Sequence, residues 1–151
     1  MNRTIVVALM LVLAGTQTLH AGNNLTQAAS SGNMQAVRQS VIIDLEGVDD
    51  IDKWGWAALL WAVYYGHLPV VKRLLNYNAD PNIRSVMDYR SFQRGTTALI
   101  LAAYYGRDEV IEALLKEKAD PSVVDKNGKK AIDYAREYRF EKCVTLLEEK
   151  K

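Results

Sequence analysis

The side chains that could carry out acid–base or nucleophilic chemistry are few and far apart in this sequence of 151 residues. His67, Cys143 and Asp52 show no spacing that indicates a nucleophile, a base and an orienting acid. No glycine-rich phosphate loop and no paired-cysteine zinc motif is present in the sequence. We therefore expect that the protein is not an enzyme and uses no cofactor or metal.

Aromatic side chains, in contrast, occur in a repeated arrangement. Tyr64 and Tyr65 precede Gly66, and the pair Tyr104–Tyr105 precedes a second glycine in the same way. Tyrosine and tryptophan combine a large apolar ring with a polar group, and they dominate the binding energy of protein interfaces. The formal charge is only +1, which argues against bulk attraction to nucleic acid or an anionic membrane. The chemistry indicated is recognition of a protein partner by local surface contacts.

The aromatic pairs recur because the chain itself repeats. Gly32, Gly66 and Gly106 recur at similar intervals along the chain. Arg139, 33 residues after Gly106, takes the place of a fourth glycine. Seven residues before each of these four positions stands an apolar residue: Leu25, Leu59, Leu99 and Ile132. Four residues before each position stands an alanine: Ala28, Ala62, Ala102 and Ala135. Apolar pairs one helical turn apart follow, as in Val70–Val71 and Leu74–Leu75. A period near 33 predicts stacked units of two helices each.

These residues resemble the ankyrin-repeat pattern D-x-x-G-x-T-P-L-H-x-A-A-x-x-G-H-x-E-V-V-x-L-L-L-x-x-G-A-D. The clearest copies run from Asp52 to Asp80 and from Arg94 to Asp120, and weaker copies run from Leu25 to Val41 and from Asp125 to Glu149. The resemblance implies an all-α solenoid of about four helix-turn-helix repeats joined by hairpin-like fingers. No histidine stands at the T-P-L-H position in any copy, so we expect apolar packing in place of the family's hydrogen-bond network.

The amino terminus has the pattern of an export signal of bacterial type. Arg3 precedes an apolar run from Ile5 to Ala14, which is too short to cross a bilayer, and we expect cleavage after Ala21. A buried helix of the fold is the alternative interpretation. The expected organisation is a signal peptide at 1–21 and an ankyrin-repeat domain at 22–151, with repeats at about 24–51, 52–84, 92–124 and 125–149. The expected location is periplasmic or secreted, without membrane insertion once the signal is removed.

Several notable residues have structural interpretations. Cys143 falls where other repeats have Val70 and Val110, so we expect a buried thiol. His67 occupies the turn position where the family usually has histidine, and Trp61 is expected in the core. Residues 84–94 are an insertion in one finger, interpreted either as a tolerated surface insertion or, because of its arginines and aromatics, as part of an interface.

The resemblance implies that the fingers and the outward side of each first helix line a concave groove for a partner. Carried over to this sequence, with Tyr89 of the insertion, the groove positions are Trp54, Trp56, Tyr64, Tyr65, Tyr89, Arg94, Thr96, Tyr104, Tyr105, Asn127, Lys129, Glu137 and Tyr138. The alternative is that one tyrosine of each pair packs against the neighbouring repeat, which would expose only half of the rings.

The expected function is that of a non-catalytic protein–protein interaction module exported to the periplasm. The alternatives are a secreted effector that acts on a host-cell protein, and a self-associating structural unit. We expect a monomer, with a homo-oligomer as the alternative, and no binding of nucleic acid.

Overall fold

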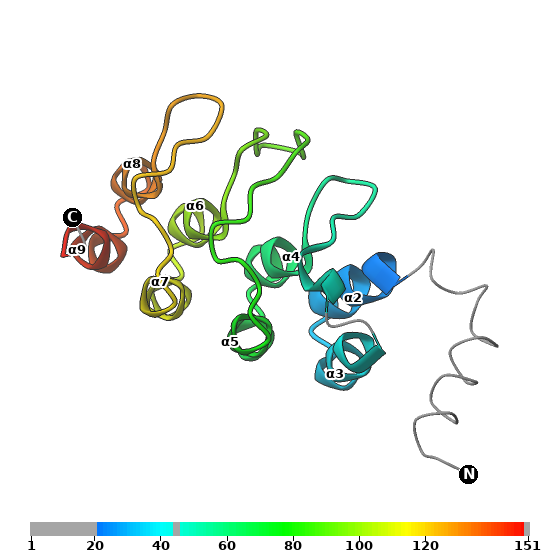
Figure 1. Cartoon of the computed structure of the whole chain (residues 1–151). Helices are drawn as coiled ribbons and strands as arrows, with labels where there is room; N and C mark the ends of the chain where they lie inside the picture. The colour runs from blue at the N-terminus through cyan, green and yellow to red at the C-terminus, as the bar shows by residue number, and fades with distance from the viewer. Residues whose placement is uncertain (1–20, 44–45, 150–151) are drawn as a thin grey trace, which may run out of the picture.

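The computed structural model describes residues 21–43 and 46–149, and within them four helix pairs follow one another (Figure 1). The predicted export signal lies outside the described residues except for Ala21, where the first pair begins. In chain order the elements are α2 (Ala21–Ser30), α3 (Met34–Ile43), the 3-10 helix η1 (Glu46–Asp49), α4 (Ala58–Tyr65), α5 (Leu68–Asn76), α6 (Ala98–Tyr104), α7 (Asp108–Lys116), α8 (Ala131–Glu137) and α9 (Glu141–Glu148).

The helices form two rows, one of α2, α4, α6 and α8 and the other of α3, α5, α7 and α9 (Figure 1). The loops between pairs project as fingers beside the first row. Within the described residues there are isolated antiparallel bridges but no named strands, which confirms the predicted all-α solenoid. No helix in this part of the chain is both long enough and apolar enough to span a bilayer.

The two rows differ in their sequence because they differ in burial. In α5, Val70, Val71, Leu74 and Leu75 make one buried stripe, and the other residues face solvent or are partly covered. In α4, every residue from Ala58 to Val63 is buried, because α4 lies between α2, α6 and α5. A central helix of this kind must be apolar on nearly every side.

The turn between the two helices of a repeat needs a left-handed backbone. Gly66 has φ +81° and Gly106 has φ +65°, a region that side chains with a β-carbon adopt at a cost. A β-carbon added to Gly106 would also lie 2.6 Å from the ring of Phe140 in the next repeat. Arg139 adopts φ +59°, so the prediction that it takes the place of the fourth glycine is confirmed.

The predicted core positions are buried. Leu99 is 1% exposed and Trp61 is 5% exposed, and the four repeated alanines lie inside the stack. Cys143 is also buried as predicted, and desolvation raises the pKa of its thiol. A raised thiol pKa leaves little thiolate at neutral pH, so this cysteine is a packing residue.

The fingers are short hairpins that hydrogen-bond to one another. Antiparallel bridges join Ile51 to Ala57 and Arg84 to Thr97. Between fingers, the Val86 amide donates to the Gly55 carbonyl at 3.1 Å and the Lys126 amide donates to the Arg94 carbonyl at 3.2 Å. These bonds hold neighbouring fingers side by side, as the helices of neighbouring repeats are.

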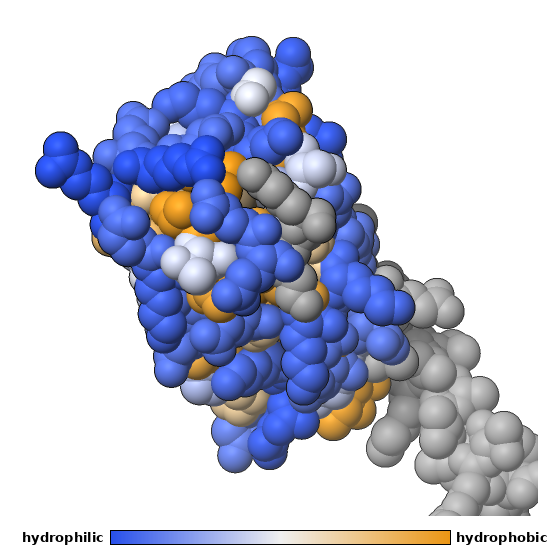
Figure 2. Space-filling view, turned by 90° about the vertical axis from the view of Figure 1, so that its left-hand side faces the viewer, coloured by the Kyte–Doolittle hydropathy of each residue, from blue (hydrophilic) through white to orange (hydrophobic). Residues whose placement is uncertain are grey.

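The end of the stack formed by α8 and α9 has a mainly hydrophilic surface with small, separated apolar patches (Figure 2). Arg136 of α8 and Glu148 of α9 form an ion pair of 2.6 Å across this end. A repeat with a polar outer face can end a stack because it has no further neighbour to cover.

Candidate partner-binding groove

Three tyrosines, one from each of three successive repeats, form an exposed row beside the first helices. Tyr65, Tyr105 and Tyr138 each stand immediately before the left-handed turn residue of their repeat. Their exposed fractions are 50%, 37% and 43%. We call these three residues the tyrosine ladder. The repetition of the sequence thus places the same side chain in the same setting three times.

The other tyrosine of each pair is half-buried and packs against the next repeat. The ring centroid of Tyr64 lies 5.7 Å from that of Tyr105, and the centroid of Tyr104 lies 4.8 Å from that of Tyr138. Tyr104 also contacts Tyr134 of the following repeat. The alternative in which one tyrosine of each pair packs between repeats is therefore confirmed.

Each ladder ring is supported by the side chain two residues further along. His67 lies beside Tyr65 with 25° between the ring planes, the Arg107 guanidinium lies 4.8 Å from the Tyr105 ring centroid, and Phe140 lies beside Tyr138. The same side chains cover the turn residue of the preceding repeat, at positions Gly32, Gly66 and Gly106. One contact network therefore fixes both the stacking of repeats and the position of the ladder.

His67 has the structural role that the sequence predicted. Its Nε2 lies 3.0 Å from the Ser30 carbonyl oxygen of the preceding repeat. A β-carbon on Gly32 would lie 2.8 Å from the imidazole ring. The glycine at this turn is therefore required both by its φ of +71° and by the close approach of His67.

The expectation that Trp56 faces solvent is wrong, because its side chain is fully buried. Tyr89 and Phe92 of the inserted finger lie against it, with ring centroids at 5.2 Å and 6.1 Å. The two inserted residues are joined by a pair of backbone hydrogen bonds, from each amide to the other's carbonyl, around the turn at Arg90. The insertion thus folds back onto the groove, and Phe92 is itself buried.

The expectation that Thr96 contributes to the surface is also wrong, because it is 1% exposed. Its amide donates to the Ser85 hydroxyl oxygen at 3.1 Å, and its own hydroxyl donates to the Gln93 carbonyl at 2.6 Å. The bond to Ser85 joins the two sides of the inserted finger, so Thr96 holds that finger together.

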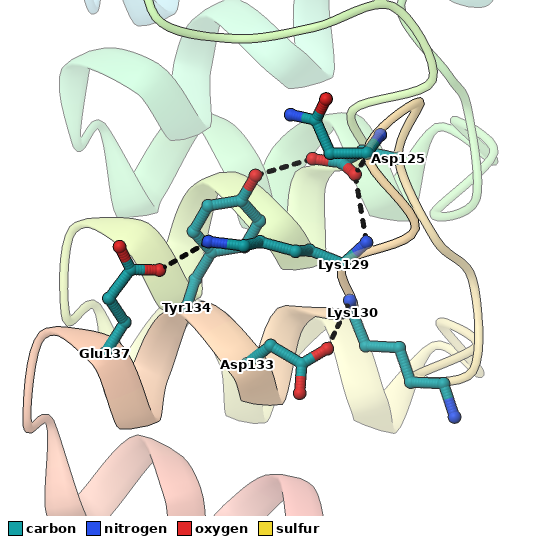
Figure 3. A network of polar contacts seen from close by, with 7 residues as sticks. Asp125, Lys129, Lys130, Asp133, Tyr134 and Glu137 are labelled. Carbon is teal, nitrogen blue, oxygen red and sulfur yellow. Dashed lines mark hydrogen bonds and ion pairs between the residues drawn. The ribbon is translucent and has the colours of Figure 1, made fainter.

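In two of the fingers, an aspartate at the base accepts hydrogen bonds from the finger and from the following helix. Asp125 accepts hydrogen bonds from the amides of Asn127 and Lys129 through Oδ1, and from the Tyr134 hydroxyl at 2.5 Å through Oδ2 (Figure 3). In repeat two, Asp52 accepts from the amides of Trp54 and Trp56, and from the Trp61 indole at 2.7 Å. Repeat three has buried Phe92 and Leu101 at the equivalent positions. The base of the middle finger therefore has apolar packing where the other two have a carboxylate and its donors.

The remaining predicted groove positions differ in their exposure. Trp54, Arg94 and Asn127 are exposed, and Tyr89 is partly buried. Lys129 is partly buried and its Nζ lies 2.7 Å from Glu137 of α8 (Figure 3). Of these, Trp54 adds a fourth exposed ring to the ladder, in contact with Tyr89 at a centroid distance of 5.9 Å.

The helix pairs, fingers and left-handed turns described above agree with a comparison of the sequence with known families. A model of ankyrin repeats in three copies matches residues 2–85 and 86–151. The chain belongs to the ankyrin-repeat family. Ankyrin repeats are generally protein–protein interaction modules, and proteins built from them are typically non-catalytic. A comparison with curated proteins finds no match.

The first two ankyrin repeats and the inserted finger line an open cleft of about 470 Å³ at one end of the ladder. Its walls combine aromatic rings with polar groups from α2 and the neighbouring finger: Thr26, Gln27, Ser30, Asp52, Lys53, Trp54, Trp61, Tyr65 and Tyr89. Mixed aromatic and polar walls are typical of sites that bind side chains of a partner. The cleft continues the line of the ladder into repeat one, which has no tyrosine of its own there.

The ladder phenols are hydrogen-bonding groups as well as apolar surfaces. Desolvation, with the neighbouring Tyr64, raises the pKa of Tyr105 to about 12. A hydrogen bond with Tyr104 is the first cause that raises the pKa of Tyr138 to about 12. A tyrosine of ordinary pKa, about 10, already keeps its proton at neutral pH, and the raised values extend the protonated state of these two phenols to more alkaline pH.

Two groove residues were missed by sequence reasoning. Arg107 supports Tyr105, and Phe92 covers Trp56. A signal for Arg107 exists in the sequence, because it occupies the same place after the turn glycine as His67 does in the preceding repeat. A signal for Phe92 exists as well, because it stands nine residues before Leu101, as Asp52 stands before Trp61 in the preceding repeat.

Proposed function

We propose that this ankyrin-repeat protein is a non-catalytic binding module that is exported to the periplasm and holds a protein partner along its tyrosine ladder. The observation that carries the proposal is the exposure of Tyr65, Tyr105 and Tyr138 in one row, together with Trp54. Large rings that are rigidly supported lose little conformational freedom on binding, so they contribute strongly to affinity.

Substitution of the ladder tests the proposal. The variant Tyr65→Ala/Tyr105→Ala/Tyr138→Ala is used as bait in periplasmic extract beside the wild-type protein, and any captured protein is purified and its affinity measured directly. We expect the variant to lose binding by at least about 100-fold, since hot-spot residues contribute about 2 kcal/mol or more each. Its helical circular dichroism should stay unchanged, because the three rings are exposed.

A matched control removes exposed side chains from the opposite row of helices. Lys72, Lys116 and Glu112 are exposed on α5 and α7, and their alanine variant should bind the partner as the wild type does. Equal affinity of the ladder variant and the wild type would reject the groove.

Export rests on the residues of the predicted signal, and it needs its own experiment. A carboxyl-terminal tag on the full-length protein should be recovered in the periplasmic fraction, and the mature protein should begin near residue 22 by mass. Recovery of the tagged protein in the cytosol of a host cell would instead indicate a secreted effector. Retention in the bacterial cytoplasm with the amino terminus intact would reject export.

A further inference from the structure

Charge is distributed unevenly between the fingers and the rest of the protein. The finger segments 51–57, 82–97 and 122–130 contain seven basic and three acidic residues, a net charge of +4. The other described residues contain nine basic and fourteen acidic residues, a net charge of −5. The near-neutral total therefore hides a basic side, and the fingers that form this side border the ladder.

The three finger carboxylates are occupied by bonds within the protein. Asp52 and Asp125 each accept three hydrogen bonds, as described above. Asp88 accepts from the Arg94 amide at 2.7 Å and lies 3.7 Å from the Lys126 ammonium. The fingers thus offer little acceptor capacity to the cations of a partner.

Three cations of the groove rest on aromatic rings. The ammonium of Lys53 lies 5.2 Å from the Trp54 ring centroid, and the guanidinium groups of Arg90 and Arg107 lie 5.7 Å from Tyr89 and 4.8 Å from Tyr105. Within the described residues none of the three cations forms an ion pair. The Arg107 Nη1 is buried without a hydrogen-bond partner in this part of the chain. Cations held in place without counter-ions favour an anionic ligand.

We infer that the segment bound along the ladder is an acidic stretch of a protein, with carboxylates placed to meet the exposed Lys53 and Arg90, in the field of the partly buried Arg107, while its apolar side chains lie against the rings. This inference rests on the proposed function and names the chemistry of the partner. Lys53 lies in the finger before α4 and Arg90 in the inserted finger before α6, so the carboxylates must be spread along the segment. Glutamate at every third residue of an extended chain, which rises about 3.3 Å per residue, spaces the carboxylates about 10 Å apart.

A protein segment fits this groove better than single-stranded nucleic acid does. Successive bases need open ring faces to stack on. Here adjacent rings are packed edge to face, with 84° between Tyr64 and Tyr65 and 72° between Tyr104 and Tyr105. The described residues together carry 16 basic and 17 acidic groups, too few net positive charges to attract a phosphate backbone at long range.

Labelled peptides test the inference by fluorescence anisotropy with the mature protein. The probe is an extended peptide of about twelve residues with glutamate at every third position and leucine and serine between. The control peptide has glutamine in place of each glutamate. We expect the acidic peptide to bind at least about tenfold more tightly, and to weaken as salt is raised from about 50 to about 300 mM.

Matched variants locate the binding site. The double variant Lys53→Gln/Arg90→Gln should lower the affinity for the acidic peptide at least about fivefold. The control variant Lys72→Gln/Lys116→Gln, which removes two exposed charges from α5 and α7, should change this affinity by less than about twofold. Equal binding of both peptides, equal loss in both variants, or no binding of either peptide would overturn the inference. A labelled single-stranded oligonucleotide that binds more tightly than the acidic peptide would overturn it as well.

The two proposals fail in different ways. If the peptides do not bind but a captured partner still depends on Tyr65, Tyr105 and Tyr138, the acidic character is wrong and the groove stands. If the captured partner binds the ladder variant as tightly as it binds the wild type, the proposal of the groove itself is wrong.

Discussion

The hydrogen bond between Tyr134 and Asp125 offers a quantitative test of how a finger is held on its helix. The two oxygen atoms are 2.5 Å apart, and Asp125 is 4% exposed. A hydrogen bond to a charged group contributes roughly 1.5–3 kcal/mol. Tyr134→Phe removes only the hydroxyl, so we expect it to lower the free energy of unfolding by that amount.

A double-mutant cycle separates this bond from the other contacts of Asp125. Asp125→Ala also removes the acceptor of the Asn127 and Lys129 amides, so its loss should exceed that of Tyr134→Phe. The double variant should lose less than the sum of the two, with a coupling of about 1–2 kcal/mol. The exposed ion pair of Arg136 and Glu148 in the same repeat is the control, and Arg136→Ala should cost under about 1 kcal/mol.

Equilibrium urea denaturation, followed by circular dichroism, measures all four variants. The slope of the free energy against urea should not change, because the same surface becomes exposed on unfolding. A lower slope would show that the last repeat unfolds by itself, and amide exchange in α8 and α9 would then replace the global measurement. A coupling below about 0.3 kcal/mol would refute the reasoning, because that is what independent sites show.

Three further predictions concern the core, a turn and pH. Leu99→Ala should lower the free energy of unfolding by about 2–5 kcal/mol through the cavity that it leaves, and a urea midpoint close to that of the wild type would contradict this. Lys118 has φ +65° after α7, so Lys118→Gly should raise the free energy of unfolding by about 0.5–1 kcal/mol, measured beside Lys116→Gly, which should lower it. Raising the pH above 10 should lower the free energy of unfolding, because folded Tyr105, with a pKa raised to about 12, keeps its proton after the unfolded chain has lost it at its ordinary value of 10.0. Urea titrations at several alkaline pH values should show a smaller loss in Tyr105→Phe, and an equal loss would contradict the raised pKa.

The repeat pattern predicted most of the stack because burial at each position depends on the period. Leu99, Ala102 and Cys143 could be placed in the core from their spacing to a turn residue alone. The same spacing placed Arg139 at the position of the turn glycines, and the structure gives it a left-handed φ of +59°. Positions that recur in every unit are thus predictable even where the residue type departs from the pattern.

The groove was predicted less well because an insertion has no equivalent in the other repeats. The resemblance to the family implied that Trp56 lines the groove, and its place in the repeat pattern makes that assignment reasonable. The insertion then returns Tyr89 and Phe92 to the same surface and covers the indole. Whether an inserted loop extends into solvent or folds back depends on contacts that a period of 33 residues does not contain.

The carboxylates at the finger bases show a signal that could have been found. Asp52 and Trp61 are nine residues apart, as are Asp125 and Tyr134, and each pair joins an acceptor to an aromatic donor. Repeat three has Phe92 and Leu101 at this spacing, so both polar groups are replaced together. Joint replacement is expected where a buried polar group without its partner is costly.

The division between buried and exposed rings implies that stability and recognition can be changed separately. Trp56 and Tyr64 pack among other rings, so their truncation should unfold the protein before it reports on binding. Tyr65 and Tyr105 lie one residue further along and are held from the side by His67 and Arg107. Their own truncation leaves that support in place, because the supporting side chains remain fixed on the glycines of the preceding repeat. A ladder variant that loses its partner while its urea midpoint stays close to that of the wild type is therefore the result that this arrangement requires.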